Sequence, residues 1–208
     1  MKLFDINGPL YQFLSTFMNV LKVNVLLILF SLPIITIGPA ITAAFTVCLK
    51  MTDDTEGDVG RRFVKAFKDN LKQGIPMGLL FLFCCYVVYL DFEINRVLPE
   101  GSWALIIFGI LACFVFGMSF IYAFPLLARY ENTIMNTLRN SANIARRYFG
   151  KTILLVFIIL VEVLLFSFSS TTVFFGILIG PTCIIFTISG FAMSFFKKIE
   201  AENSSGDK

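Results

Sequence analysis

Long apolar runs, separated by short polar stretches, divide the chain. A helix that crosses a bilayer needs about 20 apolar residues, and five segments meet or approach this length. The pattern predicts an all-α, multi-pass transmembrane helical bundle in one domain over residues 1–208. The five expected spans lie within Val23 to Leu49, Ile75 to Leu90, Trp103 to Leu127, Thr152 to Phe168 and Val173 to Phe196.

The first of these runs is longer than a single span requires. It carries Pro33, Gly38 and Pro39 near its middle, and prolines and glycines at such places kink helices. We prefer one kinked helix here, which makes five spans. The alternative is a hairpin of Leu10 to Leu32 and Pro39 to Leu49, which makes six crossings and puts both termini on one side.

Two polar stretches between the spans, residues 50–74 and 129–151, are amphipathic. Within Arg61 to Lys72 the apolar side chains fall on one helical face and the basic ones on the rest. Glu131 to Phe149 has the same character. We expect two helices that lie in the membrane interface, and the order of amphipathic helix and two spans predicts a two-fold repeat. Their basic side chains either anchor the protein to anionic lipid or dock a partner protein; the candidates are Arg61, Arg62, Lys65, Arg139, Arg146 and Arg147.

Charge predicts the orientation. Residues 50–72 hold six of the 17 basic residues, residues 129–151 hold five, and the tail after residue 196 holds three. Lys and Arg are retained on the cytoplasmic side of short loops, so these segments and the C-terminus are expected in the cytoplasm. The polar residues 198–208 are expected to form a disordered cytoplasmic tail.

Composition excludes several classes of function. The chain is 57% hydrophobic and 15% charged, with a net charge of +3, too small an excess for nucleic-acid binding. It contains no histidine, the commonest general base and metal ligand, and no phosphate-binding loop, GxSxG or HExxH motif. We expect no enzyme activity, no cofactor and no metal site.

Glu162 is the one ionisable residue inside a span predicted here, in the run LVEVLLF. A carboxylate at that depth costs several kcal/mol unless it is protonated, paired or hydrated. Glu162 is therefore a candidate functional residue, with a structural contact to Ser or Thr and a role in proton or solute passage as the two alternatives.

The segment Asn24 to Ala43 reads NVLLILFSLPIITIGPAITA. Its Leu-Pro pair and Thr-x-Gly-Pro group resemble the signature of the YesL-like family, small bacterial membrane proteins with a domain of unknown function. The resemblance continues in RRFVKAFKDNLKQG and FPLLARYENTIMNTLRNS. The matching residues that we take as candidate functional residues are Asn24, Pro33, Thr36, Gly38 and Pro39.

This resemblance implies a multi-pass protein of the bacterial plasma membrane that is accessory to carbohydrate uptake by ABC-type importers. The expected partners are the lipid bilayer and the permease subunits of a sugar importer. The first alternative is a small solute transporter or channel, to which the kinked spans and Glu162 would contribute. The second is an envelope factor that assembles glycans.

Overall fold

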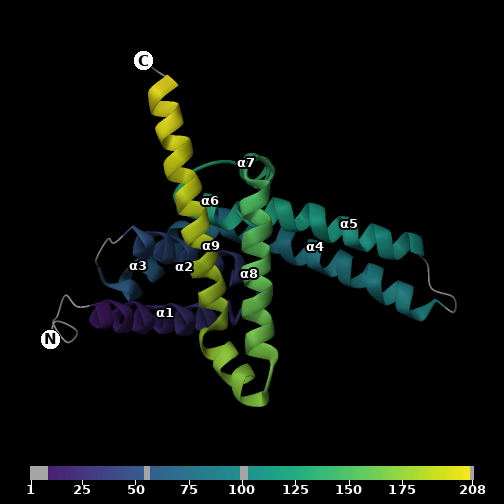
Figure 1. Ribbon diagram of the computed structural model, residues 1–208, viewed down its shortest axis with the longest axis horizontal. Coiled ribbons are helices and arrows are strands. Elements are labelled where there is room, and N and C mark those ends of the chain that lie inside the picture. The colour runs from purple at the N-terminus through teal and green to yellow at the C-terminus, as the bar shows by residue number, and fades with distance from the viewer. Residues whose placement is uncertain (1–8, 54–56, 99–102, 207–208) are drawn as a thin grey trace.

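The computed structural model describes residues 9–53, 57–98 and 103–206, and within these ranges the chain forms helices and no strand (Figure 1). Six helical segments there are long and apolar enough to cross a membrane, which fits a multi-pass transmembrane bundle. The helices are α1 (Pro9–Ser31), the 3-10 turn η1 (Ile34–Thr36), α2 (Ile37–Thr52), α3 (Val59–Asp69), α4 (Leu71–Val97), α5 (Trp103–Phe120), α6 (Ala123–Arg129), α7 (Ile134–Arg147), α8 (Phe149–Ser167) and α9 (Ser170–Gly206).

The N-terminal part of the chain is a helical hairpin, not one kinked span. Pro33 disfavours helical backbone at the residue before it, so α1 ends at Ser31 and the chain reverses through η1 into α2. The structure therefore has the helical hairpin of the alternative arrangement, and each of its two helical segments is long and apolar enough to cross a membrane. Since α1 begins at Pro9, Lys22 lies within a candidate span, Phe13–Ser31, and its side chain is exposed.

Helix α2 is the centre of the bundle. It packs against α1, α3, α4, α6 and α9. In its apolar window, Ile34–Thr52, 56% of the residues are buried, compared with 11 to 28% for the other five candidate spans. The other helices are therefore arranged around α2.

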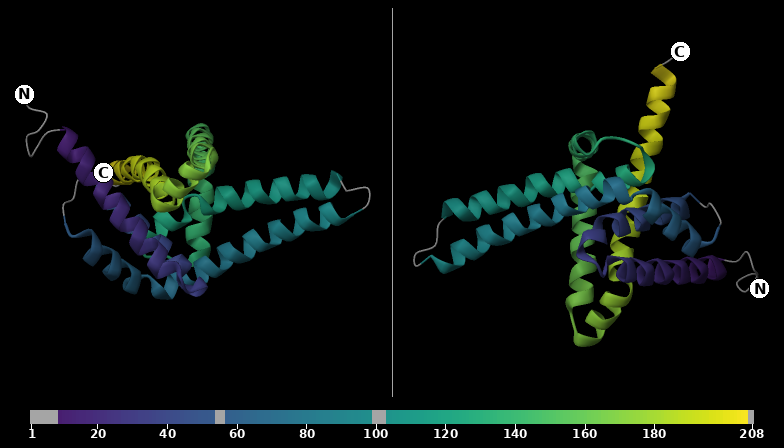
Figure 2. Two further views of the ribbon diagram at one scale, coloured as in Figure 1. Left: turned by 90° about the horizontal axis from the view of Figure 1, so that it is seen from below. Right: turned by 180° about the vertical axis from the view of Figure 1, so that it is seen from behind.

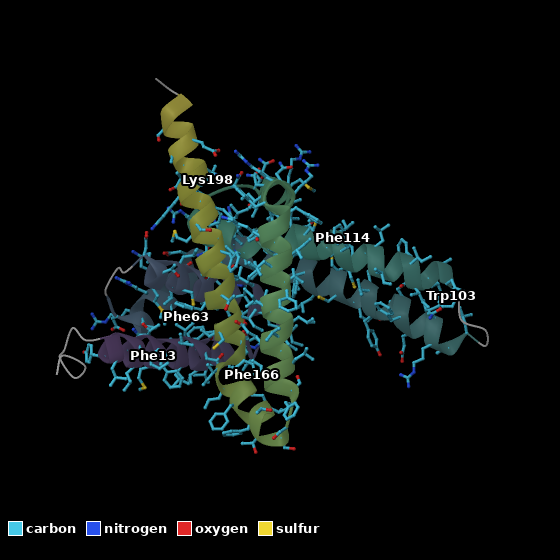
Figure 3. All side chains as sticks on the ribbon, viewed as in Figure 1. Phe13, Phe63, Trp103, Phe114, Phe166 and Lys198 are labelled. Atoms are coloured by element: carbon cyan, nitrogen blue, oxygen red, sulfur yellow. The ribbon has the colours of Figure 1, made fainter. Side chains whose placement is uncertain are left out.

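Two long helical hairpins project from this centre as separate arms. One arm is α4 with α5, and the other is α8 with the first part of α9 (Figure 1). Figure 2 shows that the arms point in different directions and that both point away from α3, α7 and the C-terminal part of α9. The aromatic side chains Trp103 and Phe166 lie toward the tips of the two arms (Figure 3).

The two amphipathic helices cover one end of the bundle. Asp58 caps α3 by accepting hydrogen bonds from the backbone N–H groups of Gly60 and Arg61. The apolar face of α3 buries Phe63 completely, against Phe30 of α1. Helix α7 packs in the same way on α5 and α6. Both apolar faces therefore pack on protein, and the expected order of amphipathic helix and two long helices occurs twice.

Helix α9 continues into the segment that was expected to be a disordered tail. It is helical through Gly206, and residues 207–208 lie outside the described ranges. Ion pairs hold this part of the helix, since Glu200 lies 3.1 Å from Arg129 and Glu202 lies 2.7 Å from Arg147. The polar composition of residues 198–208 predicted disorder. That prediction was wrong for the helical part because the ion-pair partners, Arg129 and Arg147, are distant in sequence.

Backbone meets backbone where α2 crosses α4. A Cβ on Gly78 would lie 2.6 Å from the Cα of Gly38, and a Cβ on Gly74 would lie 2.7 Å from the Cα of Pro39. Gly74 and Gly78 form a GxxxG pair, which lets helices approach closely in lipid. Gly117 of α5 lies outside such a crossing, because it has nothing within 4 Å of its Cβ position.

We predict that Gly78→Ala destabilises the protein by about 1–3 kcal/mol, because the new methyl group must push two backbones apart. Gly150→Ala is the matched control, since its Cβ position is open and alanine is the better helix former. Thermal unfolding in nanodiscs measures both. Equal melting temperatures for the two variants would show that the crossing is not close in the membrane.

Candidate functional site

Asn24 joins α1 to a break in α9. Pro181 has no N–H, so the carbonyl of Ile177 lacks its helical donor. The buried Asn24 side chain supplies one, because its Nδ2 donates to the carbonyl oxygens of Ile177 at 3.1 Å and Leu178 at 2.7 Å. Its Oδ1 accepts from the backbone N and the hydroxyl of Thr182. Asn24 thus replaces the hydrogen bonds that the proline removes.

The other residues of the family-like segment lie at the turn between α1 and α2. The Thr36 hydroxyl donates to the carbonyl oxygens of Phe30 and Pro33, each at 2.7 Å. The Pro33 carbonyl also accepts from the Thr36 backbone N–H at 2.8 Å, so Thr36 holds the turn through both its hydroxyl and its backbone. Gly38 and Pro39 are buried and form the α2 side of the crossing with α4. Asn24, Thr36, Gly38 and Pro39 therefore have packing or hydrogen-bonding roles, whereas Pro33 is exposed and precedes the turn η1.

Glu162 lies between the two helices of its arm. Its Oε1 accepts a hydrogen bond of 2.6 Å from the hydroxyl of Thr187 on α9. Its Oε2 is buried and has no hydrogen-bond partner among the described residues. The sequence left two alternatives for Glu162, a structural contact to Ser or Thr and a role in proton or solute passage. The contact to a threonine is present, and the second carboxyl oxygen has no hydrogen-bond partner among the described residues.

A second carboxyl, Asp91, is buried in the other arm, one residue beyond the end of the span expected over Ile75 to Leu90. Helix α4 has 27 residues, about 40 Å at 1.5 Å per residue, and it carries Asp91 beside Gly109 of α5. Asp91 Oδ2 is buried without a partner among the described residues. The residues after Leu90 are compatible with a helix, and this was the available sign that α4 continues to Val97. The acidic residues Asp91 and Glu93 led us to end the span at Leu90.

The described part of the span region contains an apolar cavity of about 650 Å³ between the arms. Isoleucine and phenylalanine side chains of α1, α2, α4, α5 and α9 line most of it, and Ser31 supplies a hydroxyl. Gly117 and Pro181 also face it. This lining suits hydrocarbon, such as an acyl chain or an apolar side chain, and it offers few groups to hold a polar solute.

The side of the molecule away from the arm tips is rich in charged side chains. We call it the basic end; it consists of α3, α7, the C-terminal ends of α2 and α6, and α9 from Met193 onward. Figure 3 shows nitrogen atoms gathered around α7 and beside Lys198 of α9. Three ion pairs connect α9 to the helices around it. They are Lys197–Asp53 at 2.6 Å, Arg129–Glu200 at 3.1 Å and Arg147–Glu202 at 2.7 Å.

Glu200 organises a groove at the basic end. It accepts hydrogen bonds from Arg129 Nε at 3.2 Å and from the Tyr130 hydroxyl at 2.5 Å. Burial, followed by this bond to Glu200, raises the pKa of Tyr130 to about 12. The neighbouring cavity of about 520 Å³ has an apolar floor that includes Phe196 and a rim of polar side chains that includes Asn140.

The six basic candidates divide into three kinds of position. All of them except the half-buried Arg62 are exposed. Arg61 makes an i,i+3 ion pair with Asp58, whereas Lys65 and Arg139 make no ion pair with another described residue. Arg62 lines a second cavity at the basic end. The remaining two bond within the basic end, since Arg146 donates to Asn143 and Arg147 pairs with Glu202.

Comparison with known proteins finds a family of unknown function that part of the chain resembles. Residues 20–92 match the sequence profile of a family described as "Protein of unknown function, DUF624". The match includes the segment Asn24 to Ala43 and the crossing of α2 with α4. The narrower YesL-like name rests on the sequence pattern alone. No curated protein matches, and no solved structure matches.

The described residues hold no group of three or more His, Cys, Asp or Glu side chains placed to bind a metal ion. All five cysteines are free. At the centre of the bundle, Asn24 satisfies backbone carbonyls and the glycines of α2 and α4 allow close packing. The ion pairs between distant residues lie at the basic end.

We predict that Asn24→Ala destabilises the protein by about 1–3 kcal/mol for each buried group that it leaves without a partner. Thermal unfolding measures the loss, with Asn140→Ala on the exposed face of α7 as the control. In a Pro181→Ala background the loss should shrink, because residue 181 then donates to Ile177. A loss of equal size in both backgrounds would contradict this assignment.

Glu162→Gln should leave abundance in the membrane and the melting temperature nearly unchanged, because a glutamine oxygen also accepts from Thr187. Glu162→Lys should lower both, since a lysine places a charge among apolar side chains. Quantitative blotting of membranes and thermal unfolding test the pair. Disappearance of the Gln variant would mean that Glu162 acts as a charged group with a partner.

Proposed function

We propose that the protein is a non-enzymatic accessory membrane protein that binds a partner membrane protein through its basic end, which faces the cytoplasm. One observation supports this most directly. Three ion pairs between residues distant in sequence join α2, α6, α7 and α9 into one connected charged surface. Exposed pairs contribute little to stability singly, so a surface built from several of them suits recognition better than folding.

The cytoplasmic orientation is supported by the distribution of charge. The basic helices α3 and α7 and the end of α9 lie away from the tips of the two arms (Figure 1). Six crossings place both termini on one side, in agreement with retention of Lys and Arg in the cytoplasm.

The identity of the partner is supported by the resemblance to the YesL-like family. It favours permease subunits of an ABC-type sugar importer. The exposed Arg61, Lys65 and Arg139 would guide a complementary acidic surface, since charges at the rim of an interface steer association and set partner choice. The apolar arms would lie in the lipid bilayer and reach the partner's own spans.

A second candidate function is passage of a proton or small solute. The buried oxygens Asp91 Oδ2 and Glu162 Oε2, each without a partner among the described residues, favour it. Flux through proteoliposomes that contain this chain alone tests this function directly.

The topology gives a direct prediction. In a background without the five native cysteines, Lys68→Cys, Asn140→Cys and Ser204→Cys should resist a membrane-impermeant maleimide in intact cells and react after permeabilisation. Trp103→Cys, at the tip of the α4–α5 arm, should react in intact cells. Reaction of any of the first three from outside would reverse or break the proposed topology.

The partner is tested by affinity purification in mild detergent followed by mass spectrometry. Importer permease subunits should accompany the tagged protein, and their recovery should fall with Lys65→Gln/Arg139→Gln and with rising salt. Lys22→Gln/Arg96→Gln removes two exposed charges elsewhere and should leave recovery unchanged. Equal recovery with both double variants, or no permease subunit with the wild type, would overturn the proposal.

A further inference from the structure

A groove at the basic end has α7 as one wall and the C-terminal part of α9 as another. Its volume is about 520 Å³. The lining residues of these two walls include Thr137, Asn140 and Arg147 of α7 and Ile199 and Glu200 of α9. The α7 wall from Thr137 to Arg147 is about 15 Å long at 1.5 Å per residue. This length matches about four or five residues of extended chain.

Ion pairs already fix α9 to the other walls of the groove. Arg147 of α7 lies 2.7 Å from Glu202 of α9. Glu200 of α9 accepts hydrogen bonds from Arg129 of α6 and from the Tyr130 hydroxyl. Because these contacts hold the walls in place, a bound segment does not have to order them, which lowers the cost of binding.

The floor of the groove is apolar. Leu126, Ile144 and Phe196 line it and are buried. The Phe196 ring packs edge-on against the ring of Tyr130, with 5.5 Å between the ring centroids. An apolar floor with polar groups around it is the usual lining of a binding site, in which the polar groups fix the orientation of the ligand.

Three asparagines around this floor have free hydrogen-bonding groups. The Oδ1 atoms of Asn132 and Asn143 accept from the N–H of Thr133 and from Arg146, whereas their Nδ2 groups have no partner among the described residues. The amide of Asn140 has no partner in the described ranges at all. An amide side chain offers two donors and an acceptor, and these are the groups that pair with an extended peptide backbone.

One charge at the groove is not balanced, and it is negative. Arg147 is paired with Glu202, and Glu200 is paired with Arg129. Glu131 also lines the groove, is exposed, and makes no ion pair or hydrogen bond within the described part of the chain. A carboxylate without a partner beside an apolar floor favours a ligand that carries a positive charge next to an apolar group.

We propose that this groove binds an extended segment of a partner protein in which an apolar side chain adjoins a Lys or Arg. The apolar side chain occupies the floor beside Phe196, the basic side chain pairs with Glu131, and the asparagine amides bind the backbone. This inference rests on the proposed binding of a partner at the basic end, and it names the element that is recognised. The free cations Lys65 and Arg139 lie outside the groove lining.

The probe is a phage-displayed library of random seven-residue peptides, selected on the full-length protein in phosphatidylcholine nanodiscs after depletion on empty discs. The selected sequences should be enriched in Lys or Arg next to an apolar residue. Fluorescence anisotropy then measures the affinity of the most enriched peptide. Asn140→Trp, which places a bulky side chain in the groove, should abolish binding. Glu131→Gln should weaken it by about three- to fivefold, the contribution of an exposed ion pair.

Matched variants at the same end of the molecule are the controls. Asn136→Trp adds the same bulk to α7, and Asp69→Asn removes one carboxylate charge from α3; both residues are exposed and lie outside the groove lining. Both variants should keep the affinity of the wild type. Thermal unfolding checks that each variant is folded, and Asn143→Trp replaces Asn140→Trp if the latter is not.

The double variant Lys65→Gln/Arg139→Gln separates this inference from the proposed function. It should keep the affinity for the peptide while it loses permease recovery. Peptide binding together with unchanged recovery in this variant contradicts the proposed function alone. Loss of recovery in this variant, with no peptide bound by the wild type, contradicts the groove alone.

Four results would overturn the inference. The first is that no sequence is enriched over empty discs. The second is an enriched sequence without Lys or Arg. The third is an equal loss of affinity in Asn140→Trp and Asn136→Trp. The fourth is a dimer in native mass spectrometry that Asn140→Trp dissociates, which would assign the groove to a second copy of this chain.

Discussion

A backbone carbonyl without a donor costs several kcal/mol inside a bilayer, and Pro181 creates such a carbonyl at Ile177. The rest of the bundle depends on how this acceptor is satisfied. Asn24 of α1 binds it and its neighbour Leu178, so the two helices hold each other in register. Helix α9 also packs on α1 and α2, so the hydrogen bonds of Asn24 belong to a contact among three helices.

Close approach of backbones accounts for the central position of α2. Its start lies against α4 with glycine on both sides, which allows two backbones to approach without intervening side chains. The α4–α5 arm extends from this crossing, and the α8–α9 arm extends in a different direction (Figure 2). Their divergence leaves an apolar cavity between them, while each arm encloses one carboxyl of its own, Asp91 or Glu162.

Close packing and charge are concentrated in different parts of the molecule. The residues of the family-like segment, such as Asn24, Thr36 and Gly38, act at the centre, where they satisfy carbonyl groups or permit close approach. Charged groups gather at the basic end, where ion pairs bind the last turns of α9 to the helices around it. The family-like segment therefore supports the architecture of the bundle.

The sequence by itself determined the helical class, the spans after residue 70 and the two amphipathic helices, because hydrophobic periodicity and length follow directly from what a bilayer requires. It left two arrangements open around Pro33, since a proline both kinks and ends helices. Only the tertiary structure decided that Asp91 is buried, that α9 continues to Gly206 and that Lys50, Arg62 and Arg129 share a cavity. Each of these depends on a partner far away in the chain, and local patterns carry no information about such contacts.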